Sequence, residues 1–261
     1  MDTLNLNTWV KYRDILSKLS TKAANEFRDA VWANSGRWHG AGLGAIPRNE
    51  LIEYAYALVT KYSDGASAMA CTFYDELAAV SGATVPAAVP AESATIQEVG
   101  KAVNGAIKNS GGNEEIISST IGRLVKQAGQ DTTLQNALRD GAEFAWIPAG
   151  DTCAFCLALA SRGWQPASKK AIKNGHAEHI HANCDCAYAV RFNSNFEYEG
   201  YNPEKYLRMY NSTSGSPTDK INAMRRKAYA QNKDEINAQK RDAYEKRKEL
   251  ESSEAEEINV D

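Results

Sequence analysis

The spacing of apolar residues predicts helices through the first half of the chain. Between residues 4 and 33, apolar side chains recur at steps of three and four residues, as on the buried face of an amphipathic helix. They are Trp9, Leu16, Leu19, Ala23, Phe27, Ala30 and Val31. A Gly-rich stretch at 36–44 ends the pattern and is typical of a loop. We expect one amphipathic helix, or a broken pair of helices, over 4–33.

Two further apolar stripes follow, one on each side of Asp64-Gly65. The first runs over 51–62, after a proline at position 47 that suits the first turn of a helix. The second runs over 66–77. We therefore predict two core-facing helices here. Cys71 lies within the second stripe, and we interpret it as a small buried hydrophobe.

Residues 81–93 interrupt the helical pattern with two prolines and many small side chains. Such a composition indicates a linker or an extended crossing segment. Helical spacing returns beyond it and continues to about residue 138, with one Gly-rich break at 109–113. No strand-like alternation precedes residue 140. We predict a mainly α fold, in which a helical region at 1–80 and a helical region at 94–140 flank the linker.

The C-terminal region, 193–261, is predicted to be polar and loosely built. Residues 193–215 are rich in Asn, Tyr and Ser, so we expect an irregular arm with a short helix near 203–210. Over 219–261, ten Lys and Arg residues face eleven Asp and Glu residues, and apolar positions are sparse. We predict a charged tail that is a solvated helix or partly disordered, and the alternative is a partner-binding helix that uses the basic cluster at 225–227.

Bulk composition narrows the class of protein only slightly. The 261 residues carry a formal net charge of -3 and 43% hydrophobic residues, as in an ordinary globular protein. No global basic field steers the chain onto nucleic acid. We expect neither a secretion signal, because residues 1–10 lack a basic and an apolar region, nor a membrane span, because no long apolar run occurs.

The candidate chemistry lies in closely spaced cysteines. Four of the five cysteines fall between positions 153 and 186, in a segment at 141–192. Without a secretion signal, paired cysteines of this kind indicate metal ligands rather than disulfides. Two cysteines separated by two residues can reach one ion from a tight turn, and a second cluster then closes a loop around it.

We predict a structural Zn²⁺ that staples this segment into a small α+β unit without a large apolar core. The candidate ligands are Cys153, Cys156, His181, Cys184 and Cys186. Zinc takes four ligands, so we assign the first three and leave the fourth open between the last two. His179 either contacts a metal ligand without binding the metal itself or is merely exposed.

Enzymatic alternatives have weaker support, and we expect no catalytic activity. The pair His176 and Glu178 matches the H-x-E element of zinc deaminases, but there the paired cysteines follow that element, and here they precede it. A redox role for the cysteines lacks the βαβ context. A metal-dependent nuclease remains the alternative function, with Glu178, His179 and Asp185 as the nearby candidates. Reduced cysteines without metal are a further alternative.

Three motifs in this segment carry a family resemblance. They are WIPAGDTCAFC at 146–156, LASRG at 159–163 and HANCDC at 181–186. Together they resemble the signature of phage minor head proteins related to the F protein of phage Mu, in the branch found in phages and prophages of Gram-positive bacteria. The stretch at 51–77, with TFYDEL near its end, is also similar to that branch. The resemblance covers about residues 45–192.

The resemblance implies a role in head morphogenesis rather than metabolism. Members of the family associate with the portal and the procapsid, are packaged in few copies and are implicated in DNA packaging or delivery. The expected partners are therefore the portal protein and the major capsid or scaffold protein, together with phage DNA. The expected location is the head interior or the portal region of the virion, and the host cytoplasm during assembly. No small-molecule substrate or membrane is implied.

Overall fold

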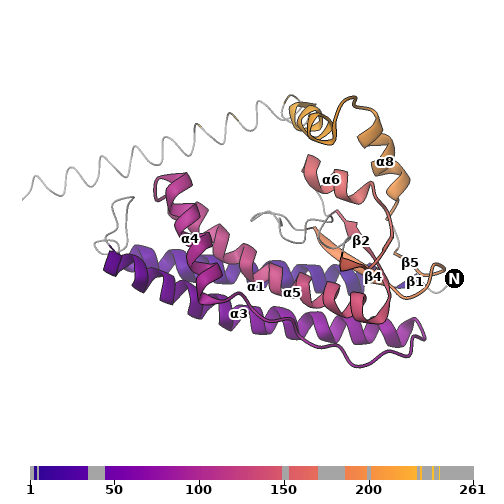
Figure 1. The fold of residues 1–261 in the computed structure, drawn as a ribbon, viewed down its shortest axis with the longest axis horizontal. Coiled ribbons are helices and arrows are strands. Elements are labelled where there is room, and N and C mark those ends of the chain that lie inside the picture. Colours follow the sequence, from indigo (N-terminus) through magenta and orange to yellow (C-terminus); the bar gives the residue numbers. More distant parts are fainter. Residues whose placement is uncertain are drawn as a thin grey trace, which may run out of the picture.

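Three long helices form the body of the protein. The computed structural model describes residues 3–4, 6–34, 45–148, 153–169, 186–198 and 201–227, and the single helical positions 230, 237 and 241. The body consists of α1 (Leu6–Ala33), α3 (Ala45–Val80) and α5 (Glu114–Asp140), which lie side by side in Figure 1. Helix α4 (Ile96–Ser110) packs on α3 and α5. A small sheet and two short helices lie at the other end of the body, so the mainly helical prediction is confirmed.

The prediction of two helices on either side of Asp64-Gly65 was wrong, because α3 is continuous from Ala45 to Val80. The two apolar stripes are successive stretches of one helix face, since buried side chains continue at three- and four-residue steps through Leu58, Tyr62 and Ala66. A glycine within a helix costs only about 1 kcal/mol relative to alanine, so Gly65 does not break α3.

Two glycines of α5 allow the body helices to approach closely. A Cβ at Gly122 would lie 2.8 Å from the carbonyl oxygen of Ser20, and one at Gly129 would lie 2.7 Å from a methyl of Leu16. The Ser20 hydroxyl donates a hydrogen bond of 2.8 Å to the Gly122 carbonyl. Helices α1 and α5 are therefore in backbone contact at this crossing.

The segment at 83–93, hereafter the strap, is an extended crossing segment that α5 holds in place. The Asn136 side chain accepts a hydrogen bond from the Val89 amide (2.9 Å) and donates one to the Val89 carbonyl (2.8 Å). Thr132 accepts a hydrogen bond of 3.0 Å from the Ala91 amide. The Arg139 guanidinium donates to strap carbonyls at 3.0 and 2.8 Å. Side chains thus replace the backbone partners that an isolated extended segment lacks.

A three-stranded antiparallel sheet follows α5. Strand β2 (Glu143–Ile147) lies between β3 (Gln165–Pro166) and β4 (Ala187–Arg191), and the β2–β4 register runs from Glu143 opposite Arg191 to Ile147 opposite Ala187. Every residue of β4 is buried, as are four residues of β2. The expectation of a segment without a large apolar core was therefore wrong.

The N-terminus and the C-terminal arm are joined. Strand β1 (Thr3–Leu4) pairs in parallel with β5 (Glu197–Tyr198), and the Trp9 and Tyr198 rings meet edge to face at 6.3 Å. Phe196 and Tyr201 are also buried, so much of the region expected to be an irregular arm belongs to the core. The short helix expected there is α8 (Pro203–Asn211).

The first turns of the charged tail pack back on α8. Residues 217–227 are helical, and Ser216 and Asp219 cap the start of this helix with reciprocal hydrogen bonds. Met224 is 8% exposed, and the Lys220 ammonium lies 4.5 Å from the Tyr210 ring centroid. A solvated helix was one of the two states predicted for the tail, and these residues are helical, but the buried Met224 shows that their helix is not solvated on all sides. Most of the remaining tail lies outside the described part of the chain. Within the described helices, none is long and apolar enough to cross a membrane.

Candidate metal centre

The register of β2 and β4 places Cys186, the last residue of the second cysteine cluster, at the end of the sheet where β2 leads on toward Cys153 and Cys156. Ile147, the last residue of β2, lies opposite Ala187, the first residue of β4. Cys153 and Cys156 follow β2 along the chain, and Cys186 immediately precedes β4. Antiparallel strands place the end of one beside the start of the other. The end of β2 and the start of β4, about forty residues apart in sequence, therefore lie together at one end of the sheet.

Cys153 sits at the start of α6 (Ala154–Ala160) as its N-cap residue, with φ −64° and ψ 154°. Its Sγ accepts a hydrogen bond from the Cys156 amide at 3.5 Å. A thiol in the N-cap position takes the place of the usual hydroxyl or carboxylate acceptor. The two cysteines are thus paired by a helix start, as a metal-binding turn requires.

The three described cysteines of this region differ in exposure. Cys156 and Cys186 are 1% and 2% exposed, whereas Cys153 is exposed. Burial raises the pKa of Tyr188 on β4, and the neighbouring Asp131 and Cys156 act in the same direction. Burial also raises the pKa of Tyr206 on α8, with a further contribution from Cys186. Each buried cysteine is therefore close to a tyrosine on a different element.

The LASRG motif connects α6 to α8. The Tyr201 hydroxyl donates a hydrogen bond of 3.2 Å to the carbonyl of Ala160, the last residue of α6. Gly163 has a φ of +64°, in the left-handed region that favours glycine, and a Cβ there would lie 3.4 Å from Pro203 at the start of α8. The motif thus ends α6 and allows α8 to pack against it.

A buried arginine on β4 was not identified from the sequence. The Arg191 guanidinium donates hydrogen bonds to Glu143 on β2 (2.6 Å) and to Glu197 on β5 (3.2 Å), and it lies 4.7 Å from the Trp164 ring centroid. Arg191 therefore connects both sheets through one buried cation. The only signal in the sequence is a single arginine at the end of the apolar run AYAVR.

Only part of the predicted ligand set can be placed. Cys153 and Cys156 come together and Cys186 lies at the same sheet end, whereas His181 and Cys184 lie outside the described residues. The same holds for the alternative groups His176, Glu178, His179 and Asp185. Within the described ranges, no three His, Cys, Asp or Glu side chains form a group that could hold a metal ion. The donors that can be placed, thiols paired by a helix start, fit zinc chemistry.

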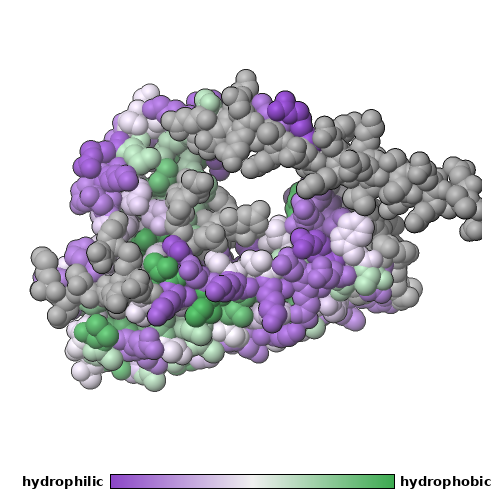
Figure 2. Space-filling model, turned by 180° about the vertical axis from the view of Figure 1, so that it is seen from behind, coloured by the Kyte–Doolittle hydropathy of each residue, from purple (hydrophilic) through white to green (hydrophobic). Residues whose placement is uncertain are grey.

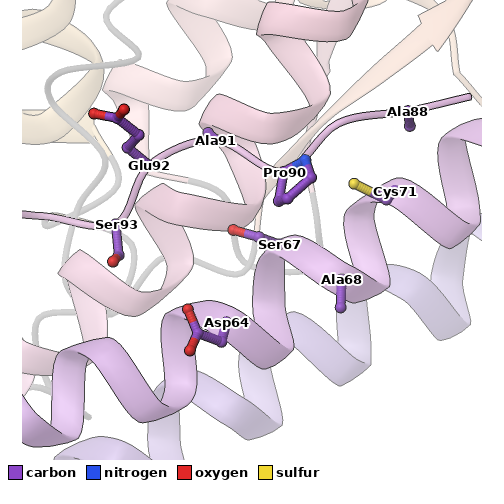
Figure 3. A pocket seen from close by; sticks show the side chains of 9 residues that line it. All are labelled: Asp64, Ser67, Ala68, Cys71, Ala88, Pro90, Ala91, Glu92 and Ser93. Carbon is purple, nitrogen blue, oxygen red and sulfur yellow. The ribbon is translucent and has the colours of Figure 1, made fainter. Parts of the chain in front are cut away.

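Cys71 is distant in sequence from this centre, and its predicted burial was wrong. It is partly exposed on α3 and lines a surface pocket between α3 and the strap (Figure 3). Burial raises the pKa of its thiol, with Asp75 acting in the same direction. Cys71 is not among the predicted metal ligands, and no other cysteine lines this pocket among the described residues.

Comparison with known protein families gives one assignment. The VG15 protein family matches residues 4–213, which include the whole body, the strap, the sheet and α8. Neither the curated proteins nor the solved structures gave a match. The family match ends just after α8, before the helix at 217–227.

Proposed function

Because this chain belongs to the VG15 family of phage proteins, we propose that it is a minor head protein of the virion that contains a structural zinc site. The proposal combines the family, which matches most of the chain, with the three motifs at 146–156, 159–163 and 181–186. The observation that supports it most is the β2–β4 register, because it pairs Ile147, in the first motif, with Ala187, which follows Cys186 at the end of the third motif.

The zinc would hold together the two chain segments that meet at this end. Cys153, Cys156 and His181 would be three ligands, and Cys184 or Cys186 the fourth. A bound Zn²⁺ supplies folding free energy by fixing thiolate and imidazole ligands in a tetrahedron. The residues of the chain supply the rest: the start of α6 orients two thiols, and the apolar ends of β2 and β4 exclude water.

A structural role is favoured over the nuclease alternative by burial. A nuclease needs metal-bound water in contact with substrate, together with a nearby base. Two of the candidate ligands, Cys156 and Cys186, are almost completely buried. We therefore expect a closed site without turnover. An assay for DNA cleavage with added Zn²⁺ tests this, and cleavage lost in a His179→Ala variant would support the enzyme instead.

The proposed partners are the portal protein and the major capsid or scaffold protein, with phage DNA as a further candidate. The protein would act in the host cytoplasm during assembly and then reside in the head interior or portal region. Figure 2 shows a mixed surface, with hydrophobic residues at the end of the body where α3 passes into the strap. Val80 and Val89, in this region, are 55% and 59% exposed. An apolar surface of this kind supports docking on another protein.

Mass spectrometry of purified particles tests the head assignment. We expect the protein in mature heads at a small fraction of the amount of the major capsid protein, and we expect particles lacking its gene to be defective in assembly or in DNA content. Its complete absence from both procapsids and mature particles would contradict the proposal. A normal yield of infectious particles without the gene would also contradict it.

A further inference from the structure

The pocket that contains Cys71 lies between two elements that are far from the candidate metal centre in sequence. It has a volume of about 740 Å³, within the range of ligand-binding pockets. Helix α3 forms one wall and the strap forms the other (Figure 3). Its described lining residues are Asp64, Ser67, Ala68, Cys71, Ala88, Pro90, Ala91, Glu92 and Ser93.

Each wall of the pocket contributes one acidic residue, and small side chains line the rest. Asp64 and Glu92 contribute two carboxylates, and no Lys, Arg or His is among the described lining residues. The nearby Arg139 guanidinium is already hydrogen-bonded to Asp140 and to carbonyls of the strap. Small apolar side chains, including Ala68, complete the wall. A ligand that fits has a cationic head and an aliphatic stem, like a lysine or arginine side chain.

A buried hydroxyl gives independent evidence that the pocket takes a polar ligand. Ser67 is only 3% exposed, and its side chain makes no hydrogen bond to any residue that the structure describes. Figure 3 shows this hydroxyl pointing from α3 toward the strap, across the pocket. This hydroxyl is not fully enclosed by protein, so a ligand in the pocket can donate a hydrogen bond to it.

We propose that this pocket binds the basic segment at 225–227 of a second copy of this chain. Arg225, Arg226 and Lys227 are all exposed at the end of the described C-terminal helix. Within one molecule, this helix and the strap lie on opposite sides of the body (Figure 1), so the segment reaches the pocket of a neighbouring copy. The charges are complementary, because a cationic side chain in the pocket can pair with Asp64 of α3 or with Glu92 of the strap.

The contact is heterologous, because the pocket and the basic segment are different surfaces of each copy. Every copy can therefore use both surfaces at once, and association continues until a ring closes or a filament grows. Charge pairing also makes the association dependent on salt.

Sedimentation velocity of the full-length protein over a range of concentrations tests the proposal. We expect salt-sensitive self-association that is weakened on the order of tenfold or more in an Asp64→Arg, Glu92→Arg variant. An Arg225→Glu, Arg226→Glu, Lys227→Glu variant should be weakened similarly. Mixing the two variants should restore association, since the reversed pocket of one then meets the reversed segment of the other. Glu53→Arg, Glu76→Arg is the matched control on exposed acids of α3, and it should associate like the wild type.

Circular dichroism of each variant confirms that the fold is retained, and alkylation of Cys71 provides a second measurement. Association should slow alkylation in the wild type and in the mixture of reversed variants, but not in either reversed variant alone. A wild-type protein that stays monomeric at all concentrations in low salt would overturn the proposal. The proposal would also be overturned if the pocket variant self-associated as strongly as the wild type. It would be overturned as well if only a basic segment of a different protein, and not a second copy of this chain, protected Cys71 from alkylation.

Discussion

Replacing Gly122 with alanine should destabilise the protein, although alanine is the better helix former. In an exposed helix interior this substitution stabilises by about 0.5–1 kcal/mol. At Gly122, however, the new Cβ would lie 2.8 Å from the Ser20 carbonyl oxygen and 2.9 Å from the Ser20 hydroxyl. The first of these atoms belongs to the backbone of α1, so no rotation of a side chain relieves the contact.

The size of the destabilisation can be worked out from the separation of α1 and α5 that the new Cβ would require. Separating α1 from α5 strains a packed core, which typically costs about 1–3 kcal/mol. It also weakens the hydrogen bond from Ser20 to the Gly122 carbonyl, which contributes about 1 kcal/mol. After the helix-propensity gain is subtracted, we expect a net loss of about 1–3 kcal/mol. For a chain of this size that corresponds to a fall in melting temperature of roughly 2–10 °C.

Thermal unfolding followed by circular dichroism measures the effect, with Gly105→Ala as the matched control. Gly105 lies within α4, and a Cβ there would meet no atom within 4 Å. The control should therefore be neutral or stabilising by up to about 1 kcal/mol. If Gly122→Ala melts at or above the wild-type temperature, the close approach of α1 and α5 is refuted.

Three further substitutions test other parts of the structure. Asn136→Ala should destabilise by about 1–3 kcal/mol in chemical denaturation, because the Val89 amide and carbonyl lose their partner, whereas Gln135→Ala, at an exposed neighbour, should be nearly neutral. The Cys153→Ser variant should lose the metal and several kcal/mol of its free energy of unfolding. It should also become sensitive to limited proteolysis near 149–185, whereas Cys71→Ser should keep both the metal and the resistance to proteolysis. Burial is the largest single influence on the pKa of Asp140 and raises it, but the hydrogen bonds from Arg139 and Tyr74 and the charge of Arg139 together lower it overall. The stabilising effect of Asp140 is therefore complete above the ordinary aspartate pKa and is lost as pH falls through the lowered folded pKa. Asp140→Asn should therefore be less stable near neutral pH and flatten the acid limb of a stability-against-pH curve, and an unchanged limb would refute this role.

The helices could be predicted from the sequence because their apolar residues recur at steps of three and four. The continuity of α3 was missed because Asp64-Gly65 has the composition of a turn. Leu58, Tyr62 and Ala66 can be recognised as one continuous face only if both stripes are placed on a single helix. The strap was recognised as extended from its prolines. Its attachment was missed, because Thr132 and Asn136 look like surface residues of a helix until their strap partners are known.

The sheet was harder to predict than the helices. Strands β2 and β4 are covered on both faces, so their residues do not alternate between apolar and polar, and strand periodicity is absent. The cysteine clusters could be found from their spacing alone. The position of Cys186 at the sheet end to which β2 runs could not, because it depends on the pairing of Ile147 with Ala187. Arg191 was missed for the same reason, since its partners are on other strands.

The most direct test of the account is zinc K-edge X-ray absorption on the purified full-length protein, together with its metal content. The account predicts one zinc per chain, with a first shell of three sulfurs at about 2.3 Å and one nitrogen at about 2.0 Å. Separate Cys184→Ser and Cys186→Ser variants should then identify the fourth ligand, since only one of them should lose a sulfur. A folded protein without bound metal would contradict the structural zinc site, and so would a shell of oxygens that includes an exchangeable water.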